Sequence, residues 1–563
     1  MPTTPATPAA PAAPAPQSPP DPPTPFLSPF LSPSGPLPLP SARRRRPGAG
    51  GTVTVVGAGM AGLVAAYELE RLGFRVEVLE GSLRLGGRVH THRFGAQEGA
   101  PFVELGAMRI PTAHHRTMGY VAHLGLADQV RPFRTLLSEE NAFLATGGGY
   151  VRLKDAPRAL VSEVRASLDL AGFREETVVF GAWLAAVVDA VAPPALRDGL
   201  RADLGGRLLG LVDEIDLTPH LRGGGKDRID VHGLFAAHPG IRAGCGSRLD
   251  GFLDDILTET SPRLVRLACG MDQLVQRLAA RIRGPIWLGQ RATGFELAAD
   301  HVRVRLGDGE AARVRRCDYV LCTVPFSVLR ELPLAGFDED KLAAVREVVY
   351  CPATKVAVHC REPFWEREGI RGGASFSGGR IRQTYYPTSG VDEPVAVAGD
   401  AGGTGTGARA GGAGDPSLGA ALLASYTIGE DADVLGGMPA PVRHRAVVEE
   451  LGRMHPQLLR RGMVRGVASL AWGGHPWTRG GCTIRWGADP AGREEQRLRA
   501  LRPQGRMYFA GEHCATEPAW IEGAVESALE AVELIARDEA RRDGPCRGER
   551  WRGAAAPAGL EAA

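Results

Sequence analysis

The chain has 563 residues, of which 44% are hydrophobic, and its 66 basic and 64 acidic side chains leave a formal net charge of +2. This length and composition predict a globular protein of two or three domains. The balanced charge excludes a general attraction to nucleic acid or to a membrane surface, and no apolar run approaches the roughly 18 residues of a transmembrane helix.

The cysteines and prolines indicate the setting of the folded part. The nine cysteines are scattered without a CxxC pair, which disfavours a zinc ribbon or a thioredoxin-like motif and favours a reduced, cytoplasmic location. The first fifty residues hold 17 of the 43 prolines, so residues 1–50 should form a disordered tail, as should residues 541–563. The basic cluster Arg43–Arg46 follows the apolar residues instead of preceding them, which argues against a signal peptide.

Apolar periodicity predicts a β-α-β unit at the start of the folded part, with strands at 52–57 and 75–79 and a helix at 60–72. A mostly helical region follows from about 112 to 262. Further strands are predicted at 285–289, 301–306, 318–324, 354–360, 421–428 and 507–511. A mobile loop rich in Gly, Ala and Thr is expected at 401–414, and a last helix at 521–540.

A nucleotide-binding loop is predicted between the first strand and the first helix. The segment Gly57-Ala58-Gly59-Met60-Ala61-Gly62 has the GxGxxG spacing. Its first glycine permits a tight turn, its second lets the backbone approach a pyrophosphate, and its third allows close packing of the helix, whose N-terminus faces the phosphates. Glu80 ends the next strand about twenty residues on, where a carboxylate can bind a ribose diol.

Two further motifs decide between NAD and FAD. Arg84 and Gly86-Gly87-Arg88 follow the second strand, and residues 507–531 read MYFAGEHCATEPAWIEGAVESALEA. Both motifs resemble the flavin amine oxidase superfamily, and the resemblance extends over roughly residues 52–538. It implies FAD as the cofactor, since an NAD dehydrogenase has no use for these motifs.

The resemblance also implies roles around the flavin. Glu512 would bind the ribityl chain, Ala292 would meet the adenine through its backbone, and the helix beginning near Ile521 would direct its positive N-terminus at the flavin. Cys514 lies near the place where covalent members carry a cysteine, but its surroundings match the non-covalent members, so dissociable FAD is expected. The residues predicted to contact the cofactor are Gly57, Gly59, Met60, Ala61, Gly62, Glu80, Arg84, Gly86, Gly87, Arg88, Gly106, Ala107, Met108, Arg109, Ala292, Gly511, Glu512, Trp520, Ile521 and Ala524.

The segment Gly106-Ala107-Met108-Arg109-Ile110-Pro111 indicates the substrate class. It resembles the GAMR-(I/L)-P motif of the L-amino acid oxidase group, in which the arginine holds the substrate carboxylate. A planar guanidinium can do so through two parallel hydrogen bonds. The alternative for Arg109 is a structural salt bridge.

By the same resemblance, the Tyr426 hydroxyl would donate a hydrogen bond to the carboxylate, and the Ala519 carbonyl would accept one from the substrate amine. Trp520 would form part of the pocket wall. Ordinary strand or core packing is the alternative for Tyr426 and Trp520. Tyr385-Tyr386-Pro387 would be pocket scaffold.

Lys355 can be argued from the sequence itself. It is one of four lysines and it interrupts an apolar strand, sharing a face with Ala353 and Ala357. A buried ammonium group is costly and usually functional, whereas an edge strand would place the lysine in solvent. In flavin amine oxidases a lysine here holds a water near the flavin N5 and promotes the reaction with O2, which makes Lys355 the predicted catalytic residue. The histidines considered for acid–base work are His92, His114, His115 and His513, and no metal-ligand spacing is present.

The implied fold class is α/β, with a discontinuous Rossmann-like FAD-binding domain, a mixed-sheet substrate domain and a helical subdomain. The predicted boundaries are 51–88, 263–345 and 500–540 for the FAD-binding domain, 89–150 and 346–499 for the substrate domain, and 151–262 for the helical subdomain. The implied reaction turns an L-α-amino acid and O2 into a 2-oxo acid, ammonia and hydrogen peroxide. An amino acid monooxygenase, an amine or polyamine oxidase and a non-catalytic flavoprotein are the alternatives, and a homodimer is an assembly common in the family.

Overall fold

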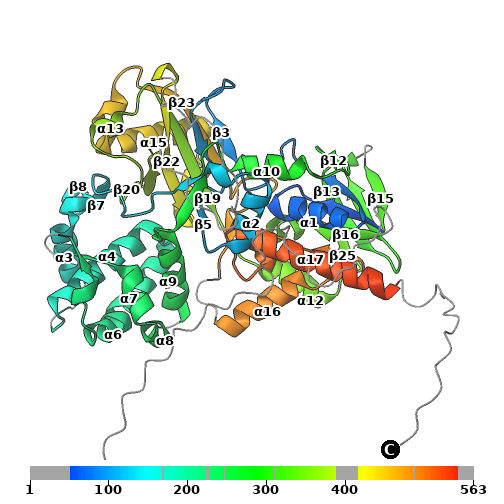
Figure 1. The fold of residues 1–563 in the computed structure, drawn as a ribbon, viewed down its shortest axis with the longest axis horizontal. Helices are drawn as coiled ribbons and strands as arrows, with labels where there is room; N and C mark the ends of the chain where they lie inside the picture. Colours follow the sequence, from blue (N-terminus) through cyan, green and yellow to red (C-terminus); the bar gives the residue numbers. More distant parts are fainter. Residues whose placement is uncertain are drawn as a thin grey trace, which may run out of the picture.

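The computed structural model describes residues 51–167, 170, 172–223, 227–245, 247–309, 312–388, 416–485 and 489–542. Its central parallel sheet combines strands from three distant parts of the chain, to the right in Figure 1. In sheet order the strands are β12 (Ile286–Trp287), β2 (Arg75–Leu79), β1 (Thr52–Val56), β16 (Tyr319–Cys322) and β25 (Met507–Phe509). Val53 of β1 pairs with Val76 on one side and Tyr319 on the other, so the predicted β-α-β unit is confirmed and later completed by the C-terminal strand.

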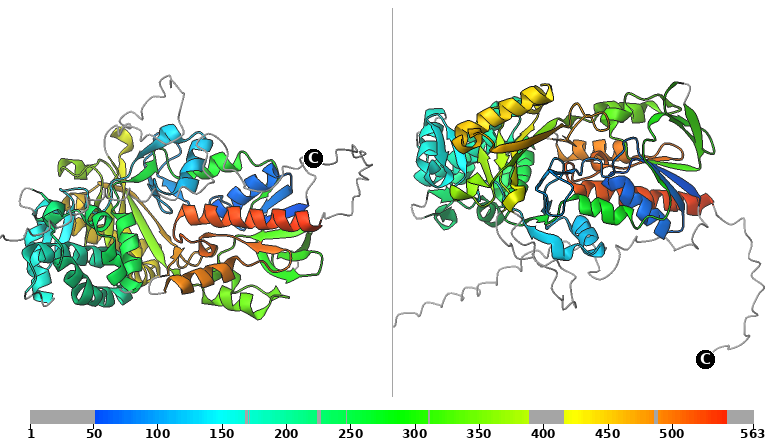
Figure 2. Two further views of the ribbon diagram at one scale, coloured as in Figure 1. Left: turned by 60° about the horizontal axis from the view of Figure 1, so that its bottom comes forward. Right: turned by 90° about the horizontal axis from the view of Figure 1, so that it is seen from above.

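Helices α1 (Met60–Arg71) and α17 (Ile521–Arg542) pack against each other beside this sheet (Figure 2). Their small apolar residues, such as Ala65 of α1 and Ala528 of α17, are fully buried in one cluster with the strand residue Val55. The predicted last helix is confirmed, and it extends two residues into the predicted tail, because α17 includes Arg541 and Arg542. The rest of the two predicted tails, residues 1–50 and 543–563, lies outside the described residues.

A second, seven-stranded mixed sheet lies at the upper left of Figure 1. In sheet order its strands are β23 (Val464–Ala471), β19 (Ala353–Cys360), β22 (Ala420–Ile428), β21 (Gln383–Tyr385), β20 (Ala374–Phe376), β7 (Phe143–Thr146) and β8 (Gly149–Arg152). The predicted strands at 354–360 and 421–428 are confirmed and pair antiparallel, which brings Lys355 opposite Tyr426. The predicted loop at 401–414 lies outside the described residues.

The expectation of a mostly helical region from 112 to 262 is confirmed for most of its length, but it is wrong between 130 and 152. The hairpin formed by β7 and β8 belongs to the seven-stranded sheet, and β6 (Val130–Pro132) belongs to a three-stranded one. Each strand has only three or four residues, too few for the alternation of side chains to stand out in the sequence. The Gly147-Gly148 pair, which forms the turn between Thr146 and Gly149, was the feature of the sequence that indicated this hairpin.

Smaller sheets complete the β structure. The four-stranded sheet holds β15 (Arg313–Cys317), β14 (Val302–Leu306), β13 (Ala292–Leu297) and β17 (Leu334–Ala335), and the three-stranded sheet holds β5 (Ile110–Pro111), β11 (Leu264–Leu267) and β6. The two-stranded pairs are β3 (Thr91–Arg93) with β4 (Phe102–Glu104), β9 (Leu221–Arg222) with β10 (Arg228–Ile229), and β18 (Tyr350–Cys351) with β24 (Cys482–Thr483).

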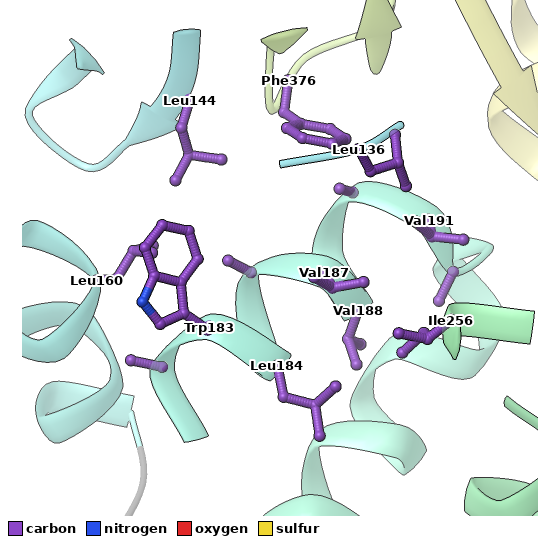
Figure 3. Packing of buried hydrophobic residues seen from close by; sticks show 14 of the residues in the cluster. Leu136, Leu144, Leu160, Trp183, Leu184, Val187, Val188, Val191, Ile256 and Phe376 are labelled. Atoms are coloured by element: carbon purple, nitrogen blue, oxygen red, sulfur yellow. The ribbon is translucent and has the colours of Figure 1, made fainter. Parts of the chain in front are cut away.

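The helices at the lower left of Figure 1 form a bundle against the seven-stranded sheet. Its members are α3 (Ala156–Ser167), α4 (Glu175–Val191), α5 (Pro194–Asp203), α6 (Leu209–Asp213), α7 (Val231–Ala237), α8 (Gly240–Gly244) and α9 (Ser247–Glu259). Figure 3 shows Trp183 of α4 packed between Leu160 of α3 and Leu144 of β7. The almost wholly apolar α4 is therefore the helix around which the bundle packs.

The remaining helices flank the sheets. They are α2 (His115–His123), α10 (Asp272–Ala279), α11 (Phe326–Leu329), α12 (Glu339–Glu347), α13 (Phe364–Arg367), α14 (Glu430–Gly436), α15 (Ala440–Met454) and α16 (Pro490–Leu501).

Candidate active site

One cavity of about 620 Å³ collects nearly all of the predicted site residues. It is lined by the carboxyl ends of β1 and β2, the segment after β4, the start of α17 and the inner edges of β19 and β22. Every residue predicted for the cofactor lines it except Gly62, and so do Lys355, Tyr426, Ala519 and Trp520. The fold thus brings together residues that are up to several hundred positions apart in the chain.

The glycine-rich end of this cavity is made of closely crossing backbone. Gly57 has a φ of +109°, which only glycine adopts readily. A Cβ atom on Gly62 would lie 1.9 Å from the Gly57 carbonyl oxygen, so this glycine acts through helix–strand packing and not through the cavity wall. Gly59 forms a parallel bridge with Gly86, and a Cβ on Gly87 would stand 3.2 Å from the Gly59 Cα. The two glycine motifs therefore form one cradle whose backbone faces the cavity and fits a bound pyrophosphate.

Glu80 and Arg84 line the cavity and also build its loops. The Glu80 carboxylate accepts hydrogen bonds from the Ala58 and Ser82 amides at 2.7 and 2.8 Å. The Arg84 guanidinium donates to the carbonyl oxygens of Leu85 and Val89, both at 2.8 Å. Much of the hydrogen-bonding capacity of Arg84 therefore holds the Gly86-Gly87 turn in shape.

Glu512 is a carboxylate that is held in the wall of the cavity. Arg88 donates to it at 2.7 Å, and the Thr483 and Ala519 amides donate to its other oxygen, both at 3.1 Å. Burial raises the pKa of Glu512, but Arg88 and the hydrogen bonds outweigh burial and lower it to about 2. Glu512 therefore stays ionised and connects β24 to the loop before α17. No feature of the sequence indicated that Thr483 would bind this carboxylate.

Arg109 lies buried beside Trp520, in the part of the cavity that is here called the Arg109 end, with only 6% of its surface exposed. Its Cζ atom lies 5.6, 5.9 and 5.8 Å from the ring centres of Phe133, Tyr385 and Trp520. Its Nη2 pairs with the carboxylate of Glu259, while its buried Nε and Nη1 have no hydrogen-bond partner. Burial lowers the pKa of Arg109, but the Glu259 carboxylate raises it above the ordinary value, so the guanidinium stays positively charged. Donors left over in a closed aromatic site are what a ligand carboxylate requires.

Lys355 is buried, as its strand position predicts, with 4% of its surface exposed. Its Nζ donates to the Gly106 carbonyl at 2.6 Å and more weakly to that of Glu104 at 3.3 Å. It stands 4.7 Å from the ring centre of Tyr426. Burial, and next the charge of Arg109, lower the pKa of Lys355 to about 7, so its protonation changes near neutral pH.

Ala519 and Trp520 stand at the start of α17. Ala519 has a φ of +67°, a strained conformation for a residue with a side chain, and such strain is common at functional sites. The Trp520 ring contacts the ring of His114 edge to face at 5.2 Å.

The histidines considered for acid–base work do not line the cavity, and His475 does. Burial lowers the pKa of His114 to about 4 and that of His513 to about 3. Neither is suited to take up a proton at neutral pH.

Several residues of the Arg109 end were missed in the sequence. They are Val191 at the end of α4, Glu259 at the end of α9, Gln383 of β21, Ile428 of β22 and Trp472. The Trp472 indole donates to the Leu105 carbonyl at 2.8 Å, and Gln383 accepts from the Tyr385 hydroxyl at 3.0 Å. None lies in a local motif, because each comes from a part of the chain that reaches the cavity only when the whole chain has folded.

In the part of the chain that the structure describes, no group of three or more His, Cys, Asp or Glu residues could hold a metal ion. No helix in that part is long and apolar enough to cross a membrane.

Comparison with known proteins agrees with this geometry. A family model described as flavin-containing amine oxidoreductase matches residues 60–536. The chain is 54% identical over 489 residues to a flavin-dependent L-tryptophan oxidase of Lentzea aerocolonigenes, covering 87% of this chain and 98% of the relative. It is 28% identical to an L-amino-acid oxidase of Echis ocellatus, covering 86% and 88%. The match to the family and these relatives confirms the predicted resemblance and a flavin, FAD, as the cofactor.

Solved structures show the same fold. A cyclohexylamine oxidase from Brevibacterium oxydans superposes with a TM-score of 0.56 at 18% identity, covering 87% of this chain and all of that one. A putrescine oxidase variant gives 0.53 at 19% identity, covering 87% and 99%. The predicted amine oxidase-like α/β fold class is thereby confirmed.

Proposed function

Since the chain belongs to the flavin-containing amine oxidoreductase family, we propose that it is an FAD-dependent oxidase of L-α-amino acids with a large aromatic side chain. L-tryptophan is the leading candidate substrate, and the products are the 2-oxo acid, ammonia and hydrogen peroxide. The observation that carries the proposal is Arg109, a buried cation with two unused donor atoms that opens into the same cavity as the glycine cradle. A binding cleft for an amine without a carboxylate has no need of such a group.

The residues of the cradle suit FAD. The backbone of Gly57 and Gly59 and the N-terminus of α1 would hold the pyrophosphate, and Glu80 stands beside them for the ribose. The start of α17 borders the cavity near Arg109, so its positive end would stabilise the negative charge of a reduced flavin bound there. When bound, FAD supplies a two-electron acceptor that takes hydride from carbon and returns the electrons to O2.

The substrate would be oriented by charge and by aromatic rings. Arg109 would hold the carboxylate, Tyr426 would add a hydroxyl donor, and the Ala519 carbonyl would accept from the amine. Arg109 is buried and flanked by the rings of Phe133 and Trp520, and low exposure to water strengthens each of these interactions. Val191 and Ile428 give the side-chain part of the cavity an apolar wall. Together with the name of the 54% identical relative, this wall supports an aromatic substrate over an acidic one.

Lys355 would act on the oxygen half of the reaction. It is buried beside Tyr426 and Gly106 and changes protonation near neutral pH. A group of this kind can hold a water molecule and present a proton as O2 is reduced.

The test is anaerobic mixing of the purified holoenzyme with each of the twenty L-amino acids and with tryptamine, while flavin absorbance is followed. Bleaching by L-tryptophan and other aromatic amino acids, and none by tryptamine, is the expected result. Bleaching by tryptamine alone would replace the proposal with an amine oxidase. Mass spectrometry of the aerobic product then separates the 2-oxo acid of an oxidase from the amide of a monooxygenase. No bleaching by any compound would leave a non-catalytic flavoprotein.

The cytoplasmic location and the homodimer remain proposals. Analytical ultracentrifugation of the holoenzyme tests the dimer, and fractionation of cells that express the full chain tests the location.

A further inference from the structure

Glu259 is the carboxylate partner of Arg109 in the wall of the proposed substrate site, and it belongs to no sequence motif. It is the last residue of α9, its side chain is 18% exposed, and it lines the cavity. It pairs with Nη2 of Arg109. Its charge also acts on Lys355, Tyr385 and Tyr426, the other polar groups at this end. Glu259 is therefore electrically coupled to the residues proposed to bind the substrate.

The other carboxylates of the cavity wall are held elsewhere. Glu80 caps the nucleotide loop and Glu512 is held by Arg88, Thr483 and Ala519. Glu331 pairs with Arg479. Among the described cavity residues, the negative charge at the Arg109 end therefore comes from Glu259.

The pairing of Arg109 with Glu259 leaves room for a second carboxylate. A guanidinium has five N–H donors arranged as two forks that share Nη2, and that nitrogen carries two of the five. Glu259 takes Nη2 with one oxygen, while Nε and Nη1 remain without partners. A substrate carboxylate can thus occupy one fork while Glu259 keeps its place. The two negative groups would then lie side by side on one cation.

We propose that Glu259 selects the zwitterionic amino acid over the 2-oxo acid that it becomes, by holding the substrate ammonium next to the carboxylate on Arg109. An amino acid brings both charges, so Arg109, Glu259 and the ligand form a balanced set of alternating charges. The 2-oxo acid brings only its carboxylate, which meets Glu259 with nothing to offset the repulsion in a site closed by aromatic rings. Glu259 is a specificity-determining residue that holds substrate and lets product go.

This inference rests on the proposed function and its test uses two inert ligands with the tryptophan skeleton. α-Methyl-L-tryptophan is a zwitterion without a hydrogen on Cα, so it cannot be oxidised by loss of hydride. Indole-3-propionate is the tryptophan skeleton without the amine. Each is titrated into the holoenzyme, and binding is read from the flavin absorbance change and by calorimetry.

The wild-type protein should bind the zwitterion more tightly than the anion. In Glu259→Gln, zwitterion binding should weaken about 10- to 100-fold, the range for one charged hydrogen bond, while anion binding stays equal or tightens. Glu259→Asp keeps the charge and should keep most of the preference. Glu140→Gln, which neutralises the exposed partner of Arg228 outside the cavity, should leave both affinities unchanged.

Flavin content and the melting temperature show whether each variant is folded, and Glu259→Ser is the second neutral variant if the glutamine fails to fold. An unchanged ratio of the two affinities in a folded neutral variant overturns the inference and leaves the proposed function standing. Wild-type protein that binds neither ligand overturns both.

Discussion

The glycine-rich end and the Arg109 end of the cavity obtain their shape in different ways. At the first, backbone crosses backbone so closely that a Cβ on Gly62 would lie 1.9 Å from the Gly57 oxygen. At the second, charged and aromatic side chains from four segments converge around one guanidinium. The first end is therefore sensitive to added volume, and the second to a change of charge or hydrogen-bond geometry.

The largest effect is expected for Arg109→Lys, at the Arg109 end of the cavity. An ammonium group cannot reproduce a planar fork, so kcat/KM for L-tryptophan should fall about 10²- to 10⁴-fold, as for the loss of one to two charged hydrogen bonds. Steady-state kinetics measure this, and flavin content should not change, because the contacts of the Arg109 side chain, with Glu259 and Trp520 among them, do not include the glycines of the cradle. A variant with wild-type kcat/KM would remove Arg109 from substrate binding.

Gly62→Ala tests the glycine-rich end of the cavity. Its Cβ would strike the Gly57 carbonyl, which is main chain and cannot swing away, so we expect a loss of about 1–3 kcal/mol of stability and reduced flavin content. The control is Gly210→Ala in α6, where a Cβ meets no atom within 4 Å, and where alanine should be neutral or stabilise by about 0.5–1 kcal/mol. Equal melting temperatures for the two variants would contradict the close crossing.

The two ends also differ in how much of them could be predicted. The turn at Gly57, the helix at Met60 and the acid at Glu80 are consequences of neighbours in the chain, so spacing alone reveals them. Arg109 and Lys355 were found because each stands out locally, one in a motif and the other as a charge in an apolar strand. Glu259 reaches Arg109 only because α9 packs against the cavity, and no spacing encodes a contact across 150 positions.

A smaller effect is expected for Lys355→Met, in the oxygen half of the reaction. Anaerobic flavin reduction should stay within a few fold of the wild type, and the stopped-flow rate constant for reoxidation should fall about 10- to 100-fold, typical of a lost proton donor. In the wild type the rate should fall as pH rises through about 7, because the proton leaves Lys355 there. Reoxidation at the wild-type rate would show that O2 is reduced without this residue.

Stability should reveal the same titration. Since the folded-state pKa of Lys355 lies near 7, below its ordinary value, the unfolded chain binds more protons between those two values. This lysine therefore makes the folded state less stable as pH falls through that window. Lys355→Met should lose that dependence, which urea titrations at several pH values can measure. If the stability of the variant depended on pH as steeply as that of the wild type, the Lys355 ammonium group would have to lie in solvent.

The smallest effect is expected for Cys514→Ala, which asks whether the flavin is attached to the chain. Covalent attachment needs a thiolate that reaches the flavin, yet Cys514 is fully buried, does not line the cavity, and has its pKa raised by burial to about 12. Acid precipitation of the wild type should leave the yellow chromophore in the supernatant, and the alanine variant should retain full flavin content with about 1 kcal/mol less stability. Cys351 and Cys482 do line the cavity. If the chromophore precipitates with the protein and stays there in Cys514→Ala, Cys482 is the next residue to replace, because it is the more exposed of the two.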